Sequence, residues 1–224
     1  MTGDPTRPLH APRAAAAGGP GLFITFEGGD GAGKTTQASL LEDWVRTRGR
    51  NVVRTREPGG TELGLRIREI VLHHRGHIDP RAEALLYAAD RAHHIATSVR
   101  PAVARGDVVI QDRYLDSSVA YQGAGRVLDA NDVRALSLWA TDGLLPDLTV
   151  LLDLDPAAAR RRLDAADKPF DRLEAEKEEF HARVREGFLS LAADEPGRFL
   201  VLDARAAPEE LAARVRNAVA ERLG

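Results

Sequence analysis

The chain contains no cysteine and only three lysines, although 31 of its 224 residues are lysine or arginine. Without cysteine it can form neither disulfides nor thiolate metal sites, which fits a cytoplasmic protein. Aromatic residues make up only 5%, and no apolar stretch approaches the roughly 18 residues of a membrane span. The net charge of -3 argues against a general nucleic-acid-binding scaffold. We therefore expect a soluble, globular, cytoplasmic protein without nucleic-acid or membrane partners.

The length of the chain suits one well-buried domain and is short for two. Residues 1–20 are rich in Ala, Pro and Gly, and their only basic residues are Arg7 and Arg13. This segment lacks the apolar core of a secretory signal, so we predict a disordered tail, with a transit peptide as the alternative. Residues 21–224 are predicted to form a single α/β domain.

One of the three lysines lies in a glycine-rich segment that matches the Walker A phosphate loop. The segment is Gly28, Gly29, Asp30, Gly31, Ala32, Gly33, Lys34, Thr35 and Thr36. In such a loop the glycines let backbone N–H groups surround phosphates, the lysine reaches the β- and γ-oxygens, and the first threonine ligates Mg²⁺. A glycine-rich turn is the plain alternative, whereas the dinucleotide fingerprint G-x-G-x-x-G does not fit these residues. The pattern predicts an ATP-binding site.

The neighbouring sequence supplies the structure that such a loop needs. An apolar run at 22–26 predicts a buried strand before it, and the spacing of Leu40, Leu41, Trp44 and Val45 predicts a helix after it. Further strands are predicted at 51–55, 108–110, 149–152 and 199–202, and helices at 62–74, 80–105 and 208–223. Strands that alternate with helices indicate a parallel sheet covered on both faces. Ligands of such folds bind beyond the carboxyl ends of the strands, where the segments at Gly28, Arg56 and Asp112 fall.

Four ordered segments of the chain together resemble the thymidylate kinase family, bacterial type. They are Arg56-Glu57-Pro58-Gly59-Gly60-Thr61, Tyr87-Ala88-Ala89-Asp90-Arg91, the run from Val109 through Asp112-Arg113-Tyr114 to Gly123, and Asp171-Arg172-Leu173-Glu174. With the phosphate loop they cover the chain from about Leu22 to its end. The resemblance implies a P-loop nucleoside monophosphate kinase fold with a five-stranded parallel sheet and a lid segment at about 160–174. It also implies a homodimer.

The resemblance further implies that ATP donates its γ-phosphoryl group to dTMP, with Mg²⁺, giving ADP and dTDP for dTTP synthesis. By that resemblance Tyr87 stacks on the thymine, Arg91 bonds its carbonyl, and Arg113 holds the acceptor phosphate. Tyr121 lies against the deoxyribose, and Asp30 orients the acceptor. The metal contacts fall to Thr35 and Asp112. The remaining substrate contacts implied are Glu57, Ser117, Ser118, Gln122, Asp171 and Glu174.

Each of these side chains has a plainer interpretation by itself. Tyr87 and Tyr121 could be helix core residues, Arg91 a surface partner at helical spacing, and Asp112 with Arg113 a local ion pair. Their joint occurrence favours the functional interpretation. His93 and His94 have no comparable argument and are expected to be structural.

The chain differs from some members of that family in the phosphate loop, where positions 29 to 32 carry no basic residue. Phosphoryl transfer needs positive charge beyond Lys34 and Mg²⁺, and arginine is the usual source. We therefore assign the transition-state arginine to the lid, where Arg160, Arg161 and Arg162 are adjacent. Arg162 is the preferred candidate and Arg172 the second. A solvated helix face is the alternative for this charge run.

Two other functions remain open at this level. The same fold could act on another nucleoside monophosphate or on a deoxynucleoside, which a panel of acceptors distinguishes. A P-loop switch or a nonenzymatic binding module is the second alternative. A GTPase switch would need an Asn-Lys-x-Asp motif, and none of the three lysines supplies one.

Overall fold

The computed structural model describes residues 20–126, 128–165 and 170–223. Nearly all of the tail predicted at 1–20, and residues 166–169 of the expected lid, lie outside the described residues. The helices within them are α1 Lys34–Thr47, α2 Glu62–His73, α3 Pro80–His94, α4 Arg100–Ala104, α5 Leu115–Ser118, α6 Ala130–Ala140, α7 Pro156–Ala165, α8 Glu178–Asp194 and α9 Pro208–Leu223. Two π-helical segments join them, η1 at Ile95–Val99 and η2 at Val119–Ala124.

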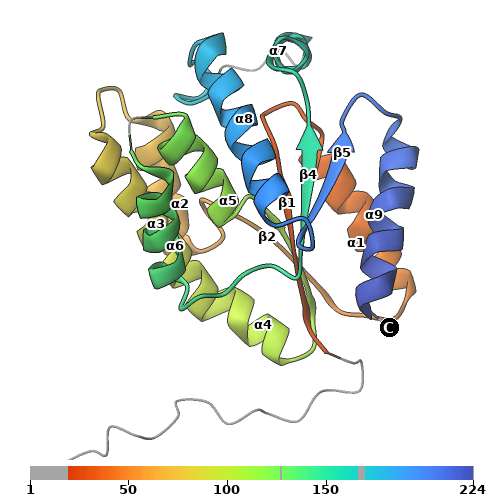
Figure 1. Cartoon of the computed structure of the whole chain (residues 1–224). Coiled ribbons are helices and arrows are strands. Elements are labelled where there is room, and N and C mark those ends of the chain that lie inside the picture. Colours follow the sequence, from red (N-terminus) through yellow and green to blue (C-terminus); the bar gives the residue numbers. More distant parts are fainter. Residues whose placement is uncertain (1–19, 127, 166–169, 224) are drawn as a thin grey trace, which may run out of the picture.

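Five parallel strands form one sheet in the order β2-β3-β1-β4-β5 (Figure 1). Their bounds are β1 Leu22–Glu27, β2 Val52–Arg56, β3 Val108–Asp112, β4 Leu148–Asp153 and β5 Phe199–Asp203. Each predicted strand is therefore present, to within one or two residues at its ends. Strands β1 and β3 are central and almost completely buried, because helices cover both faces of the sheet. The predicted fold class is confirmed.

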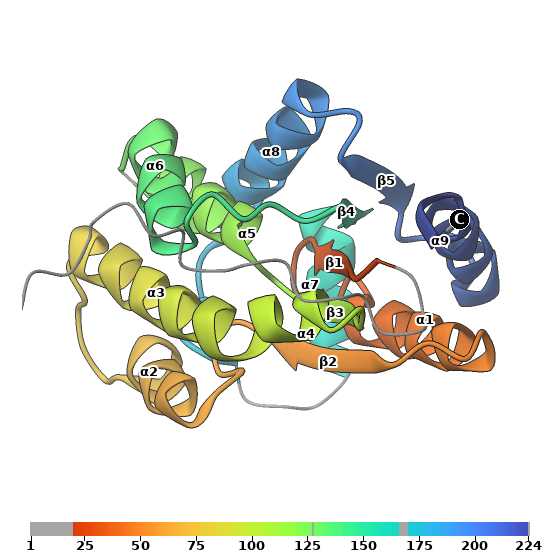
Figure 2. The ribbon, with the colours of Figure 1, turned by 90° about the horizontal axis from the view of Figure 1, so that it is seen from below.

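The side chains of β1 show how the two faces are divided. Leu22, Ile24 and Phe26 pack in one core cluster with α1 and α9, whereas Phe23 belongs to a second cluster with residues of η1, α5 and α6. Successive residues of a strand point to opposite faces, so one run of apolar residues serves both clusters. Figures 1 and 2 show α1 and α9 on one side of the sheet and α4, α5 and α8 on the other.

The long helix predicted at 80–105 is divided into α3, η1 and α4. Pro101 lies in the first turn of α4. Proline has no N–H group and its ring clashes with the carbonyl four residues earlier, so a regular α-helix cannot continue through it. The wider π-helical turn at Ile95–Val99 accommodates this residue. Among the described residues, no helix combines the length and apolarity needed to cross a membrane.

Candidate active site

The phosphate loop connects the end of β1 to the start of α1, as the sequence predicted. Gly28 has a φ of 128°, and a Cβ there would lie 2.4 Å from the carbonyl oxygen of Leu152. Only glycine fits this position, since it combines a left-handed backbone with no free space. Lys34 Nζ donates to the carbonyl oxygens of Gly28 and Gly29 at 3.1 and 2.8 Å. The Lys34 side chain therefore folds back onto the phosphate loop, and Lys34 itself begins a 14-residue helix.

Arg113 links this loop to the segment that follows β3. Its backbone has a φ of 63°, which is rare for a residue other than glycine. The guanidinium donates to the Gly28 carbonyl and to Ser117 Oγ, both at 3.1 Å, and it forms an ion pair with Asp30. It also contacts Tyr121 Oη at 3.3 Å. A strained backbone held by four partners is typical of a functional position.

The charges around Arg113 are strongly coupled. Burial opposes ionisation of Asp30, but Arg113 and then Lys34 outweigh it and lower the pKa of Asp30 to about 2. Burial lowers the pKa of Lys34, and the nearby Arg113 lowers it further. Lys34 and Arg113 therefore lie at the mouth of the phosphate loop beside the carboxyl groups of Asp30 and Asp112. The two cations can hold an anionic ligand there.

Glu27, which no sequence motif marked, holds in place the residues that follow Arg113. One carboxylate oxygen accepts the Tyr114 N–H at 2.7 Å, and the other accepts the Ser117 hydroxyl at 2.6 Å. Burial, and then the neighbouring Asp116, raise the pKa of Glu27 to about 8. The only sequence signal for it was its place at the end of a buried strand, directly before the loop.

A cavity of about 130 Å³ lies beside the loop, and we call it the acceptor cavity. It is lined by Asp30, Glu57, Pro58, Arg68, Leu72, Tyr87, Arg91, Arg113, Tyr114, Ser117, Ser118, Tyr121, Gln122, Asp171, Leu173 and Glu174. All ten substrate-contact residues expected from the sequence are among them. Tertiary structure thus brings together segments from the phosphate loop to the end of the lid. Arg68 and Leu72 also line the cavity, although no sequence motif marked them.

Arg91 crosses the floor of this cavity, and its partners are more numerous than the sequence suggested. Nε donates to Glu57 at 2.8 Å, and the other nitrogens donate to Ser137 Oγ, to Ser118 Oγ and to the Tyr114 carbonyl. The side chain is only 2% exposed. The plain interpretation of Arg91 as a surface partner is therefore wrong.

Glu57 commits both carboxylate oxygens to protein partners, Arg91 and His94 Nδ1 at 2.9 Å. His94 is completely buried and its Nε2 lies 2.6 Å from Thr55 Oγ1. Glu57 therefore orients Arg91 and joins β2 to α3, although it also lines the cavity. The direct contact of Glu57 with a substrate stays a prediction.

The residues expected to hold a metal lie together at the ends of β3 and the phosphate loop. Thr35 Oγ1 is 3.4 Å from Asp112 Oδ2, and Asp112 Oδ1 is buried without a hydrogen-bond partner. Among the described residues no cluster of three or more His, Cys, Asp or Glu could hold a metal by itself. One hydroxyl and one carboxylate fit Mg²⁺, which keeps several waters and takes further oxygens from phosphates.

The described part of the lid consists of α7 and the segment after residue 169. Arg162 donates to the carbonyl oxygens of Gly31 and Ala204 at 3.2 and 2.9 Å, so it joins the phosphate loop to the turn after β5. Arg160 pairs with Asp164. Arg162 thus contacts the phosphate loop directly.

Arg172, the second candidate, is held on the acceptor side. Its guanidinium donates to the Val71 carbonyl at 2.8 Å and pairs with Glu83. Its backbone N–H donates to Leu72. In this conformation Arg172 therefore anchors the end of the lid to α2 and α3, and its place as second candidate stays a prediction.

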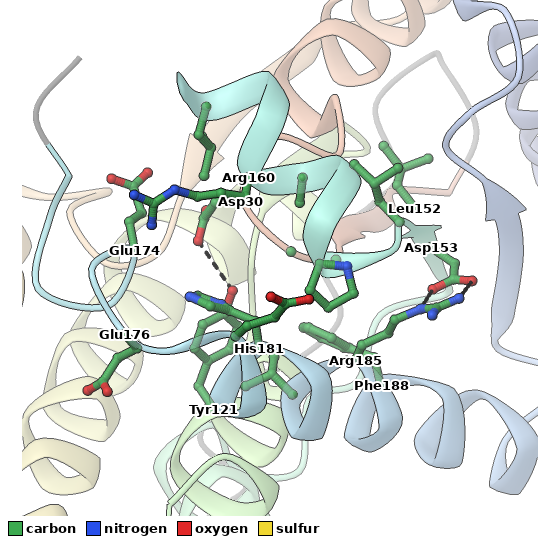
Figure 3. Close-up of a pocket in the computed structure, with 18 of the residues that line it drawn as sticks. Asp30, Tyr121, Leu152, Asp153, Arg160, Glu174, Glu176, His181, Arg185 and Phe188 are labelled. Carbon is green, nitrogen blue, oxygen red and sulfur yellow. Dashed lines mark hydrogen bonds and ion pairs between the residues drawn. The ribbon is translucent and has the colours of Figure 1, made fainter. Parts of the chain in front are cut away.

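A second cavity, of about 170 Å³, lies between α7 and α8 (Figure 3). Asp30, Tyr121 and Glu174 line both cavities. Figure 3 shows the hydrogen bond from Tyr121 to Asp30 and the ion pair of Arg185 with Asp153. No side chain of α7 is fully buried, although Ala158 and Ala159 pack against the core cluster that contains β1 and α1.

Comparison with known proteins places this geometry among enzymes of one kind. A sequence profile described as "Thymidylate kinase" matches residues 26–215. The chain is 73% identical over 197 residues to the thymidylate kinase of Leifsonia xyli, covering 88% of this chain and 93% of that protein. It is 53% identical to that of Bifidobacterium longum, covering 90% and 98%. The crystal structure of thymidylate kinase from Ehrlichia chaffeensis matches with a TM-score of 0.73 and 32% identity, covering 90% of this chain and 99% of that one.

Proposed function

The chain belongs to the thymidylate kinase family, and from this membership we propose how its residues carry out the family's reaction. The enzyme transfers the γ-phosphoryl group of ATP to dTMP, giving ADP and dTDP for dTTP synthesis. ATP is its phosphoryl donor and dTMP its acceptor.

Arg113 is the single observation on which the assignment rests. It lies between the phosphate loop and the acceptor cavity, and its guanidinium contacts both. Planar guanidinium groups match phosphate oxygens bidentately. We assign the dTMP phosphate to Arg113, since a phosphate held there would face the ATP phosphates bound by the loop.

The base and the sugar occupy the rest of the acceptor cavity in this proposal. Tyr87 supplies a ring against which thymine stacks, and Arg91 supplies a donor for a base carbonyl. Tyr121 lies against the deoxyribose, where its ring leaves little space for a 2′-hydroxyl. Asp30 orients the acceptor through its pair with Arg113. Ser117, Ser118, Gln122, Asp171 and Glu174 complete the walls.

The reaction proposed is a direct in-line attack of a dTMP phosphate oxygen on the γ-phosphorus. The acceptor phosphate is already ionised, so no strong general base is needed. Catalysis then depends on positioning and on neutralising charge. Lys34 moves from the Gly28 and Gly29 carbonyls to the β- and γ-oxygens, Arg113 holds the acceptor, and Arg162 supplies positive charge from the lid.

Mg²⁺ is the proposed cofactor. Thr35 and Asp112 would hold it, Thr35 through its hydroxyl and Asp112 through the water shell, and the unpartnered Asp112 oxygen supports this assignment. When bound, Mg²⁺ neutralises charge on the β- and γ-phosphates. Since ATP and nucleoside monophosphates are cytoplasmic metabolites, we also infer that the enzyme acts in the cytoplasm.

A homodimer is proposed through the helices farthest from β5. Large apolar side chains are exposed on α2 (Leu63, Leu65, Ile70), α3 (Leu85) and α6 (Trp139), and Trp139 is 81% exposed. Contacts join α2 to α3 and α3 to α6, so these residues belong to adjoining helices. Sedimentation at micromolar concentration tests the proposal. A sedimentation coefficient that corresponds to a monomer and does not increase with protein concentration would contradict it.

The substrate assignment is tested with purified enzyme, ATP and Mg²⁺ in a coupled assay for ADP. The acceptors are dTMP, dUMP, UMP, dCMP and AMP. We expect dTMP to give the highest kcat/KM, because Arg91, Tyr87 and Tyr121 match its carbonyls, its flat base and its deoxyribose. Equal rates with dTMP, UMP and AMP would contradict the proposed cavity.

A further inference from the structure

Glu83 is a buried carboxylate that the proposed mechanism does not use. It lies on α3, one helical turn before Tyr87, and only 1% of its surface is exposed. One carboxylate oxygen accepts Gln122 Nε2 at 2.9 Å and lies 3.7 Å from Arg126 Nε, and the other pairs with Arg172. Two segments distant in sequence, at 122–126 and at 172, thus converge on this one group.

The chemistry of this cluster fixes the orientation of the Gln122 amide. As the partner of the Arg172 guanidinium, Glu83 is a carboxylate, and a carboxylate only accepts hydrogen bonds. The NH₂ group of Gln122 must therefore point to Glu83, since the reverse orientation would bring two acceptor oxygens together. The carbonyl oxygen of Gln122 is left at the opposite side of the amide. Gln122 itself is 2% exposed and lines the acceptor cavity.

The position of this amide along the cavity indicates what it can contact. Gln122 bonds a residue of α3 that is one turn from Tyr87, the proposed platform for the base. Arg113 and Asp30, at the phosphate end, lie on the loops after β3 and β1. The amide therefore belongs to the nucleobase end of the cavity.

We propose that Glu83 is a positioning residue for base selection, because it fixes the Gln122 carbonyl as an acceptor for the imide N–H of thymine. This inference rests on the proposed function. Thymine and uracil carry a donor at that ring nitrogen, whereas cytosine carries an acceptor. A cytosine lone pair would face the carbonyl oxygen of Gln122, and neither group would have a hydrogen bond. A site built for one hydrogen-bonding pattern rejects the reverse pattern strongly.

The test is the ratio of kcat/KM for dTMP to kcat/KM for dCMP in wild-type enzyme and in Glu83→Gln. In this variant Arg172 retains the side-chain oxygen, so the new NH₂ group faces Gln122. Gln122 must then turn its carbonyl to position 83 and its NH₂ group to the cavity. We expect the ratio to fall by about tenfold to hundredfold, because dTMP would lose its hydrogen bond to the Gln122 carbonyl and would face the NH₂ group instead. An unchanged ratio in a folded variant would overturn the proposal.

Two further variants separate the effect of the amide from other effects of residue 83. Arg172→Met removes the ion pair but leaves a carboxylate facing Gln122, so the ratio should stay within about threefold of wild type. A fall as large as that of Glu83→Gln would overturn the proposal, because loss of the lid anchor would then explain both. Gln122→Met should also lower the ratio. If Glu83→Gln does not fold, an unchanged ratio in Gln122→Met overturns the proposal instead.

The wild-type measurement distinguishes this inference from the function on which it rests. Absence of dTMP phosphorylation by the wild-type enzyme would refute the assigned reaction. Strong dTMP activity together with an unaltered base preference in Glu83→Gln would refute only the role of Glu83.

Discussion

Replacing Arg113 by lysine tests the central contact of the site, because the substitution keeps the charge and changes the geometry. The guanidinium has four partners, which are the Gly28 carbonyl, Ser117, Asp30 and Tyr121. The single ammonium group of lysine cannot reach all four partners. It also cannot hold a phosphate through two parallel hydrogen bonds, as a guanidinium group does. We count at least two lost hydrogen bonds that involve charged groups.

The expected magnitude follows from those two bonds. Each is worth about 1.5–3 kcal/mol when a charged group takes part, so the loss of transition-state stabilisation is about 3–6 kcal/mol. At about 1.4 kcal/mol for each factor of ten, kcat/KM for dTMP should fall by a factor of about 10² to 10⁴. The KM for ATP should change much less, since Lys34 and the loop backbone are unaltered.

The assay is steady-state kinetics by coupled ADP detection, with the two substrates varied separately. Arg185→Lys is a matched control, because Arg185 also forms a two-point contact with a carboxylate, Asp153, at 2.6 and 2.9 Å. That residue has no part in the proposed chemistry, so we expect near wild-type kinetics. Retention of kcat/KM for dTMP within about fivefold in Arg113→Lys would refute the reasoning, provided that both variants unfold at similar temperatures.

Three further predictions concern the phosphate loop, a buried carboxyl group and a buried ion pair. Lys34→Met should lower kcat by orders of magnitude with an unchanged circular dichroism spectrum, because the β- and γ-oxygens lose their cation; near-normal turnover would exclude the phosphate-loop assignment. Glu27 has a folded-state pKa of about 8 against an ordinary 4.5, so the folded state binds more protons between these values and wild-type stability should fall as pH rises from 4.5 to 8. The same decline should be smaller in Glu27→Gln by urea unfolding at several pH values, and equal slopes would contradict the burial argument. Asp116→Asn should destabilise the fold by about 3 kcal/mol in chemical denaturation, because Arg198, bonded to Asp116 at 2.7 and 2.8 Å, then keeps only the more exposed Glu195 as a carboxylate partner; a change below about 1 kcal/mol would contradict this.

The strands and the phosphate loop could be predicted from the sequence because their signals are local. Val108, Val109 and Ile110 form an unbroken apolar run, as a strand covered on both faces requires, and the structure extends it only to Asp112. The glycines of the loop mark backbone geometry that other residues cannot adopt. The helix predicted at 80–105 is likewise helical from Pro80 to Ala104, and only its π-helical turn at Ile95–Val99 was not predicted.

The site was only partly predictable, and the errors have a common cause. Motifs mark residues of a distinctive type at fixed spacing, so Tyr87, Arg113 and Gln122 were found and do line one cavity. Glu27 and Glu83 carry no such mark, because a glutamate in a strand or helix is ordinary until its partners are known. The pairing of Arg172 with Glu83 could not be predicted for the same reason, since the sequence neighbours of neither residue show it.

By itself the sequence determined the order of the elements, the place of the phosphate loop and the kind of reaction, because local propensity and short motifs carry this information along the chain. Only the tertiary structure decided which charges neutralise one another. Arg113 faces Asp30 across 83 positions of sequence, and Arg172 faces Glu83 across 89. Such pairs form because folding brings the ends of separate strands and helices to one edge of the sheet. The low pKa of Asp30 and the direction of the Gln122 amide are therefore properties of the folded chain, and no segment of it has them alone.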